Sequence, residues 1–322
     1  MERREFLRKN GELFLSLPFL AATRPDFSLR PGLAEYESYA FTIGKFKCRV
    51  FKDQMFKYLG KDYFINVPDE EVSRALERYQ QKPDNIPSPF VSMLIENGSD
   101  KILIDTGIGY SREPITFRGK SYQFQGRLLE ILAREGVRPE EITTLVLTHF
   151  HPDHIGGVYS DAGTPNFPKA RVVLHEAEWD FWRSDRSAGQ SPMFYLFIRN
   201  NIEPLNKGNL ELLRGQEAEI SPGVTAIRIP GHTPGQIAVR LASEGKGLIY
   251  ISDAFLHPLH IEHLDWQTNY DLDHAEARKS RSRLLSLAAE AGLPIQAFHF
   301  EFPGIGRAEK AGNGWKWASA KI

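Results

Sequence analysis

Four side chains that can bind a metal ion fall within six consecutive positions of this sequence: His149, His151, Asp153 and His154. Imidazole and carboxylate groups are the ligands that zinc and similar divalent ions prefer. The apolar residues 144–147 predict a buried strand directly before this cluster, and the glycines at 156 and 157 suit a closely packed backbone after it. A polar surface loop with incidental histidines is the alternative, but the density of ligands favours a metal centre at a strand end.

Three further candidate ligands each follow an apolar run much later in the chain: His232, Asp253 and His299. His232 lies in a Gly-His-Thr-Pro-Gly loop, whose glycines and prolines favour a tight turn around one imidazole. A metal ion in a protein takes at least three protein ligands, so the first cluster needs such additions. A single histidine at a strand end is more often structural than functional. As a set, however, the seven side chains predict a shared site at the edge of a sheet.

The elements that must position these side chains are short apolar strands mixed with amphipathic helices. We predict strands over residues 90–96, 101–104, 144–147, 171–174, 224–229, 236–241, 248–251 and 295–298. Residues 97–100 favour a tight hairpin turn between the first two strands. Helices are expected over residues 128–132, ending near Gly136, and over residues 275–290. Strand and helix signals alternate along the chain, which indicates a layered α/β protein.

Composition limits the classes of partner. The chain has 322 residues, of which 41% are hydrophobic and 25% charged, as in a globular protein with a large core. Its net charge is −1 and no basic stripe is evident, so neither nucleic acid nor a membrane surface is expected as a partner. Cys48 is the only cysteine, which excludes a thiolate metal cluster. We expect a small-molecule substrate, and a homodimer stays open.

The order of these motifs resembles the metallo-β-lactamase superfamily. His-x-His-x-Asp-His at residues 149–154 is followed by the Gly-His-Thr-Pro-Gly loop at residues 231–235, a strand-end aspartate and a late histidine. The resemblance extends from about Phe90 to the end of the chain. It implies an α/β fold of the four-layer αβ/βα sandwich type, with two divalent metal ions at one edge. Zinc is the first expectation, although manganese, iron and cobalt suit the same ligands.

The resemblance also implies a role for each ligand. One ion would be bound by His149, His151 and His232. The other would be bound by Asp153, His154 and His299, with Asp253 bridging the two ions. Asp105, which ends the strand at residues 101–104, would hold a ligand imidazole in place. A helix cap or turn cap is the alternative interpretation of Asp105.

The end of the chain is similar to one branch of the superfamily. Residues 299–306 and 314–317 look like the methyl parathion hydrolase branch and its lactonase relatives. Acyl-homoserine lactonases have a tyrosine three residues after the bridging aspartate to assist the substrate carbonyl, and this chain has Leu256 there. The departure favours the parathion-hydrolase side and puts a tyrosine-assisted mechanism in doubt.

The resemblance implies an enzyme, a binuclear metal-dependent hydrolase. A metal-bridging hydroxide would cleave a small hydrophobic ester, lactone or phosphotriester. Asp153 and Asp253 would be the catalytic carboxylates, since they can orient that hydroxide and accept its proton. A glyoxalase II-like thioester hydrolase and a non-catalytic metal-binding protein are the alternatives.

Apolar side chains near the metal motifs predict the substrate pocket: Trp179, Trp182, Phe194, Phe197 and Leu256. Packing in the core or at a dimer contact is the alternative for Phe194 and Phe197. Five histidines have no assigned role, and most are expected to be surface or structural residues: His175, His257, His260, His263 and His274. Three of these, at 257, 260 and 263, are close enough in sequence to Asp253 to line the site.

The first 25 residues have the composition of a targeting signal. Arg3 and Arg4 precede Phe6, Leu7 and an apolar stretch at residues 13–22 that is too short to span a membrane. This arrangement resembles a twin-arginine export signal, which predicts a periplasmic or exported protein. Residues 26–322 would then form a single hydrolase domain. The alternative is an uncleaved basic amphipathic helix on a cytoplasmic protein.

Overall fold

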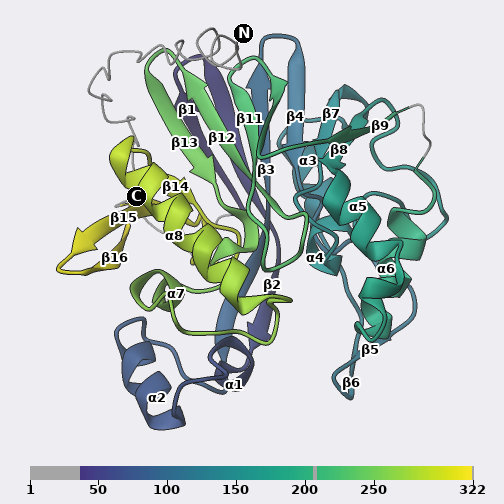
Figure 1. The fold of residues 1–322 in the computed structure, drawn as a ribbon. Helices are drawn as coiled ribbons and strands as arrows, with labels where there is room; N and C mark the ends of the chain where they lie inside the picture. The colour runs from purple at the N-terminus through teal and green to yellow at the C-terminus, as the bar shows by residue number, and fades with distance from the viewer. Residues whose placement is uncertain (1–36, 206–208, 321–322) are drawn as a thin grey trace, which may run out of the picture.

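The computed structural model describes residues 37–205 and 209–320. The export signal predicted over residues 1–25 lies outside the described residues. Two seven-stranded sheets face one another, and helices cover their outer faces (Figure 1). Within the described ranges, no helix combines the length and apolar character needed to cross a membrane.

The first sheet joins an antiparallel half to a parallel half. Its strands, in spatial order, are β1 (Ser38–Ile43), β2 (Phe46–Tyr58), β3 (Ile86–Asn97), β4 (Asp100–Ile104), β7 (Thr144–Val146), β8 (Arg171–His175) and β9 (Leu210–Leu213). The pairs from β1 to β4 are antiparallel, and those from β4 to β9 are parallel. Gly98, with φ +63°, forms the predicted hairpin turn between β3 and β4. The strand pattern missed β1, β2 and β9, because charged and polar residues interrupt their apolar positions.

The second sheet is antiparallel except at one pair. Its strands, in order, are β10 (Glu217–Ser221), β11 (Val224–Arg228), β12 (Ile237–Ser243), β13 (Lys246–Tyr250), β14 (Ile295–Gln296), β15 (Ile305–Ala311) and β16 (Gly314–Ser319). Strands β13 and β14 run parallel. The strand predicted over residues 295–298 is only two residues long, so the chain leaves the sheet just before His299.

The helices occupy the connections between strands. They are α1 (Gly60–Tyr63), α2 (Asp69–Glu77), α3 (Leu128–Arg134), α4 (Pro152–Ile155), α5 (Glu176–Trp182), α6 (Pro192–Asn201), α7 (Pro258–Glu262) and α8 (His274–Glu290). Helix α8 begins where Asp273 accepts a hydrogen bond from the Glu276 amide, 3.0 Å away. Its buried Leu284 and Leu285 pack against Ile249 of the second sheet. This packing covers the outer face of that sheet, as the sandwich architecture requires.

The main core lies between the two sheets. Val50 and Leu94 of the first sheet and Val239 and Leu241 of the second are fully buried in one apolar cluster. Each such side chain contributes about 1.5–3 kcal/mol relative to an exposed one. The core therefore stabilises both sheets, and the loops that follow their strands start from fixed positions.

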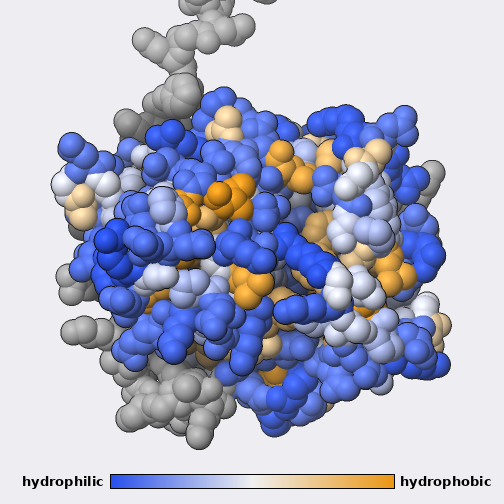
Figure 2. All heavy atoms as spheres, turned by 90° about the horizontal axis from the view of Figure 1, so that it is seen from below, coloured by the Kyte–Doolittle hydropathy of each residue, from blue (hydrophilic) through white to orange (hydrophobic). Residues whose placement is uncertain are grey.

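Four strands deliver their following loops to one edge of the sandwich. Strands β4 and β7 are parallel neighbours in the first sheet, and β13 and β14 are parallel neighbours in the second. The carboxyl ends within each pair therefore lie on one side of its sheet, and the ligand groups show that the ends of both pairs meet. This edge lies low in Figure 1, on the face that Figure 2 views from below, where apolar patches interrupt the hydrophilic surface.

Candidate metal centre

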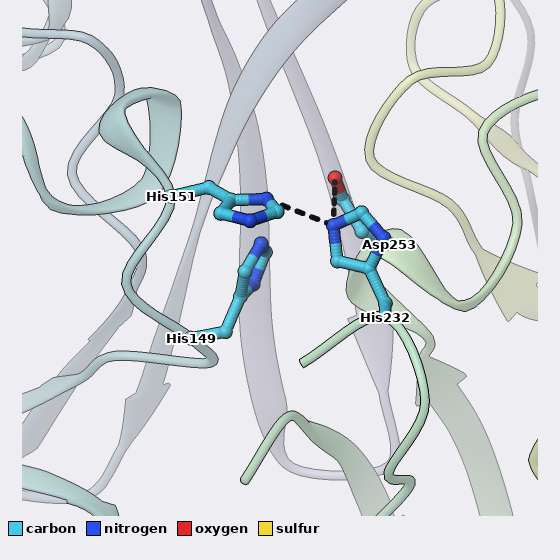
Figure 3. A group of neighbouring side chains, drawn as sticks. All are labelled: His149, His151, His232 and Asp253. Atoms are coloured by element: carbon cyan, nitrogen blue, oxygen red, sulfur yellow. Dashed lines mark hydrogen bonds and ion pairs between the residues drawn. The ribbon is translucent and has the colours of Figure 1, made fainter. Parts of the chain in front are cut away.

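Seven buried side chains converge at this edge of the sandwich in two groups that share one carboxylate. The first group is His149, His151, His232 and Asp253 (Figure 3), and the second is Asp153, His154, Asp253 and His299. Within each group, the candidate ligand atoms all lie within 4.8 Å of one another. The structure therefore brings together all seven residues that the sequence analysis named as ligands.

The local chain path explains why one short motif serves two groups. Residues 149–151 are extended, so His149 and His151 point to the same side, with ring centroids 4.6 Å apart. Pro152 then begins the single helical turn of α4, which carries Asp153 and His154 to the second group. A Cβ atom on Gly156 would lie 2.0 Å from the carbonyl oxygen of Ile108. The close backbone packing expected at these glycines is therefore observed.

The buried polar atoms of the two groups fit metal ions. His149 Nε2, His154 Nε2 and Asp253 Oδ1 are buried and have no hydrogen-bond partner. Leaving such an atom unpaired costs about 1–3 kcal/mol. In the first group His151 Nδ1 and His232 Nε2 lie 2.9 Å apart, which brings two nitrogen ligand atoms to one point (Figure 3). A divalent ion in each group satisfies these atoms, so the residues present fit two ions.

The charge states of the first group's His149, His151 and Asp253 favour ligation. Burial, reinforced by the neighbouring imidazoles, holds the pKa values of His149 and His151 well below the usual range, so both rings are neutral near pH 7. Burial alone would raise the pKa of Asp253, but His299 and His154 lower it well below its usual value. Neutral imidazoles beside an ionised carboxylate are the forms that bind a cation.

Asp105 fixes the orientation of His154. Its Oδ2 lies 2.8 Å from His154 Nδ1 and 2.9 Å from the hydroxyl of Tyr250, and its Oδ1 accepts a hydrogen bond from the Thr148 amide. The Nδ1 proton is thereby held on the carboxylate side, which leaves Nε2 of His154 free to face the ion. Asp105 has φ +57°, a conformation that aspartate tolerates better than most residues. The contact to a ligand imidazole is the one expected from the sequence.

Glu178, which the sequence analysis missed, joins the two main ligand loops. Its Oε1 accepts hydrogen bonds from the Phe150 amide and Trp182 Nε1, at 2.9 and 2.8 Å. Its Oε2 accepts from the Thr233 hydroxyl and the Gly235 amide, at 2.6 and 3.0 Å. One buried carboxylate therefore ties the loop of His149 and His151 to the loop of His232. Its position in a helix gives no signal that separates it from an exposed glutamate.

Asp271 is a second carboxylate that the sequence analysis missed. Its Oδ1 lies 3.1 Å from Nδ1 of His232, and its Oδ2 accepts a hydrogen bond from the buried Arg281 of α8 at 2.8 Å. Burial would raise the pKa of Asp271, but Arg281 and His232 hold it well below the usual range. Asp271 therefore orients His232 as Asp105 orients His154. Asp271 is 39 positions from His232, and no local pattern links them.

The Asp271→Asn variant is expected to bind one of two metal ions about 10–100-fold more weakly, the usual cost of changing a group that orients a ligand. Asparagine keeps the shape but removes the charge that holds the Nδ1 proton of His232. Titration of the metal-free protein with zinc, followed by calorimetry, measures the two affinities separately. Asp265→Asn is the matched control, because Asp265 is exposed. Equal affinities in the wild type and the Asp271 variant would show that this carboxylate is not needed.

A pocket lined by aromatic side chains opens onto the metal centre. Candidate ligands form its floor: His151, Asp153, His232, Asp253 and His299. Apolar and aromatic side chains form its wall: Phe56, Tyr58, Tyr63, Phe90, Ile108, Phe117, Phe124, Met193, Phe194, Leu256 and Tyr270, with Pro152 completing the lining. The apolar and aromatic wall around a few polar groups is that of a site for a small organic molecule.

Two of the five predicted pocket residues, Phe194 and Leu256, line this pocket, and three do not. Trp182 lies behind the wall, where its Nε1 donates to Glu178 and its ring is 6.4 Å from that of His151. Phe197 packs on Phe124 in the core, and Trp179 lies beneath the guanidinium of Arg183. Their place in the sequence between metal motifs was misleading, because the packing of α5 and α6 decides which faces meet the pocket.

The five unassigned histidines do not line the pocket, so the structural roles expected for most of them hold, and proximity to Asp253 in sequence does not bring residues 257, 260 and 263 into the pocket. His257 caps α7 by accepting a hydrogen bond from the Leu259 amide, and His260 Nε2 lies 2.9 Å from the carbonyl oxygen of Tyr63. The ring of His263 stacks on Trp266. His175 caps α5, and His274 lies 3.9 Å from Asp271.

The sequence and the structure have relatives among known proteins. Residues 88–292, well over half of the chain, match the family model described as the Metallo-beta-lactamase superfamily. An N-acyl homoserine lactonase of Bacillus cereus is 27% identical over 205 residues, which are 60% of this chain and 74% of that protein. A second N-acyl homoserine lactonase, from a Bacillus species, is 28% identical over 176 residues, or 51% of this chain and 62% of that protein.

Solved structures share the whole architecture. The dizinc quorum-quenching lactonase AidC has a TM-score of 0.76 and 22% identity, covering 88% of this chain and 98% of its own. The hydrolase AbOPH has a TM-score of 0.78 and 25% identity, covering 89% of this chain and 98% of its own. The predicted α/β sandwich is confirmed. The chain belongs to the metallo-beta-lactamase superfamily.

Proposed function

We propose that this chain, a metallo-hydrolase of its superfamily, opens the ring of a small hydrophobic lactone, with N-acyl homoserine lactones as first candidates. The observation that carries the proposal is an apolar aromatic pocket whose floor is formed by candidate metal ligands. A neutral substrate with an apolar chain and one reactive carbonyl matches both parts of that site. The lactonases among its relatives support the same substrate class.

Two divalent ions, proposed to be zinc, belong to this function. We assign one ion to His149, His151 and His232. We assign the other to Asp153, His154 and His299, with Asp253 shared between them. Such ions act as Lewis acids and lower the pKa of water to near neutrality. The dizinc character of AidC, which has the same fold, supports the choice of metal.

The wall of the pocket positions the substrate. The hydroxyl of Tyr63 is hydrogen-bonded to Ser88 Oγ, 3.0 Å away. In the described part of the chain, the hydroxyls of Tyr58 and Tyr270 have no hydrogen-bond partner. Burial holds the pKa of Tyr58 well above its usual value, so this hydroxyl stays protonated and can donate to a substrate oxygen. The ring of Tyr58 lies 5.7 Å from that of His299. Leu256, at the position where acyl-homoserine lactonases have a tyrosine, lines the pocket with an apolar side chain and offers no hydrogen-bonding group.

The same pocket disfavours a glutathione thioester. Among the described residues that line it there is no lysine or arginine to bind the carboxylates of a glutathione moiety. A neutral phosphotriester fits an apolar wall as well as a lactone does, and it stays as the second candidate for that reason.

A substrate panel tests this proposal. The zinc-loaded protein is expected to hydrolyse N-hexanoyl homoserine lactone with kcat/KM of at least about 10⁴ M⁻¹ s⁻¹, the lower end of the usual enzymatic range. We expect lower values for an aryl acetate, methyl parathion and a glutathione thioester, each followed by its released product. Hydrolysis of methyl parathion or the thioester, with every lactone untouched, would contradict the proposal.

A further inference from the structure

A small hairpin forms part of the pocket wall without belonging to either main sheet. Strands β5 (Ile115–Phe117) and β6 (Lys120–Tyr122) pair only with each other. Phe117 lines the pocket and stacks with Phe194 of α6, with ring centroids 6.5 Å apart. The ring centroid of Tyr122 lies 5.3 Å from that of Phe56 of β2. An isolated two-stranded hairpin is marginally stable, so contacts with its surroundings must hold it in place.

The tip of the hairpin reaches the opposite wall of the pocket through one side chain. Arg118, with φ +50°, occupies the turn, and its guanidinium forms an ion pair with Asp62 of α1. The same guanidinium lies 4.7 Å from the ring centroid of Tyr270, which lines the pocket. Arg118 therefore joins the hairpin to two segments on the far side of the pocket.

Those two segments form one unit. The carbonyl oxygen of Asp62 accepts hydrogen bonds from the Asn269 amide at 2.9 Å and from the Thr268 hydroxyl at 3.0 Å. Asn269 Nδ2 also donates to Asp62 Oδ1 at 3.3 Å. The far wall is thus held by several hydrogen bonds. Phe117 and Tyr122 pack the hairpin against α6 and β2, and Arg118 is the side chain that joins it to the far wall.

The contact of Arg118 with Asp62 and Tyr270 is weak enough to break when the pocket opens. The side chains of Arg118 and Asp62 are 37% and 15% exposed, so solvent and salt weaken their attraction. The contact of the guanidinium with the half-buried ring of Tyr270 is also of modest strength, because the guanidinium itself stays partly in solvent. The tie is therefore strong enough to favour a narrow pocket and weak enough to release when a larger ligand binds.

We propose that Arg118 determines the size of substrate that this pocket accepts, by tying the β5–β6 hairpin to Asp62 and Tyr270. The identity of the ligand in this inference rests on the proposed lactonase function. The contacts of Arg118 with Asp62 and Tyr270 do not depend on that function. Loss of the tie lets Phe117 move away from the opposite wall, so long acyl chains gain more than short ones.

Binding and turnover of an acyl-chain series test the proposal. Calorimetry on the zinc-loaded protein gives affinities for ring-opened N-acyl homoserines from butanoyl to dodecanoyl, and kinetics give kcat/KM for the matching lactones. In Arg118→Ala, the preference for dodecanoyl over butanoyl is expected to rise about fivefold, the scale of one exposed ion pair with its ring contact. The change should appear in Kd and KM rather than in kcat. Asp62→Asn should shift the preference in the same direction.

The controls separate the tie from a general loss of structure. Arg112→Ala removes an exposed arginine from the same segment and should leave the chain-length preference unchanged. One molar NaCl should shift the wild type toward the Arg118→Ala profile and leave that variant unaffected, because salt screens the ion pair. An unchanged preference in both Arg118→Ala and Asp62→Asn would overturn the proposal. A wild type that binds the acyl homoserines but hydrolyses no lactone would instead refute the proposed function, while the binding series still decides the role of Arg118.

Discussion

Replacing Asp253 with alanine should lower kcat/KM by on the order of 10³-fold, because loss of the shared ligand weakens both metal sites and loss of one electrostatic group in an active site alone costs about 10²–10³-fold. Asp253 is the only residue shared by the two ligand groups. Its Oδ2 lies 3.1 Å from His299 Nε2 and 3.5 Å from His232 Nε2, and its Oδ1 lies 3.2 Å from His154 Nε2. Without this carboxylate, neither ion keeps its full ligand set or the charge that balances it.

Metal content and activity together test the role of Asp253. Elemental analysis of the variant should give about one ion per chain or fewer, and circular dichroism should show that the fold is retained. Asp265→Asn is the matched control, since it changes an exposed aspartate twelve positions further along the chain. A variant that keeps the wild-type turnover number would refute the assignment of Asp253.

Removal of metal ions should abolish hydrolysis and also lower the melting temperature. Protein purified without chelator is expected to contain about two ions per chain, because the structure holds two ligand groups. Binding to the folded state alone stabilises by about 4 kcal/mol when free metal is at 1,000 times Kd. Stripping the ions should therefore lower the melting temperature by on the order of 5 °C or more. The buried side chains of Asp153 and Asp253 would then lose the divalent charge beside them.

Scanning calorimetry and a rate assay, before and after chelation, measure both effects. Adding zinc back should restore activity and stability together. In the Asp253→Ala variant, chelation should change the melting temperature much less, because fewer ions are bound at the start. Fewer than one ion per chain in the untreated protein, or hydrolysis that survives chelation, would contradict a metal-dependent function.

Local geometry explains how much of the candidate site could be predicted. An extended run followed by Pro152 positions the histidines of residues 149–151 on one side and His154 on the other, so their spacing alone carries the information. Apolar strands β4, β7 and β13 deliver Asp105, His149 and Asp253 to one edge, and parallel pairing brings the ends of β4 and β7 together. Such relations involve neighbouring residues and the regular periods of strands, which a sequence displays directly.

Contacts between distant segments could not be predicted in the same way. Glu178 and Asp271 each orient a ligand loop from another element. The sequence does not distinguish a buried carboxylate from an exposed one. Side chains of β2, including Tyr58, form a wall of the pocket, while Trp179 and Phe197 turn away from it. Which face of a helix or strand meets the pocket depends on how the whole layers pack.

By itself, the sequence determined the seven candidate ligands, the sandwich architecture and the apolar character of the substrate site. Only the tertiary structure decided which carboxylates orient those ligands, which rings enclose the substrate and where Arg118 ties the pocket together. The physical reason is that ligand type and strand period are local properties of the chain. Enclosure of a pocket instead arises when residues far apart in sequence are packed against one another.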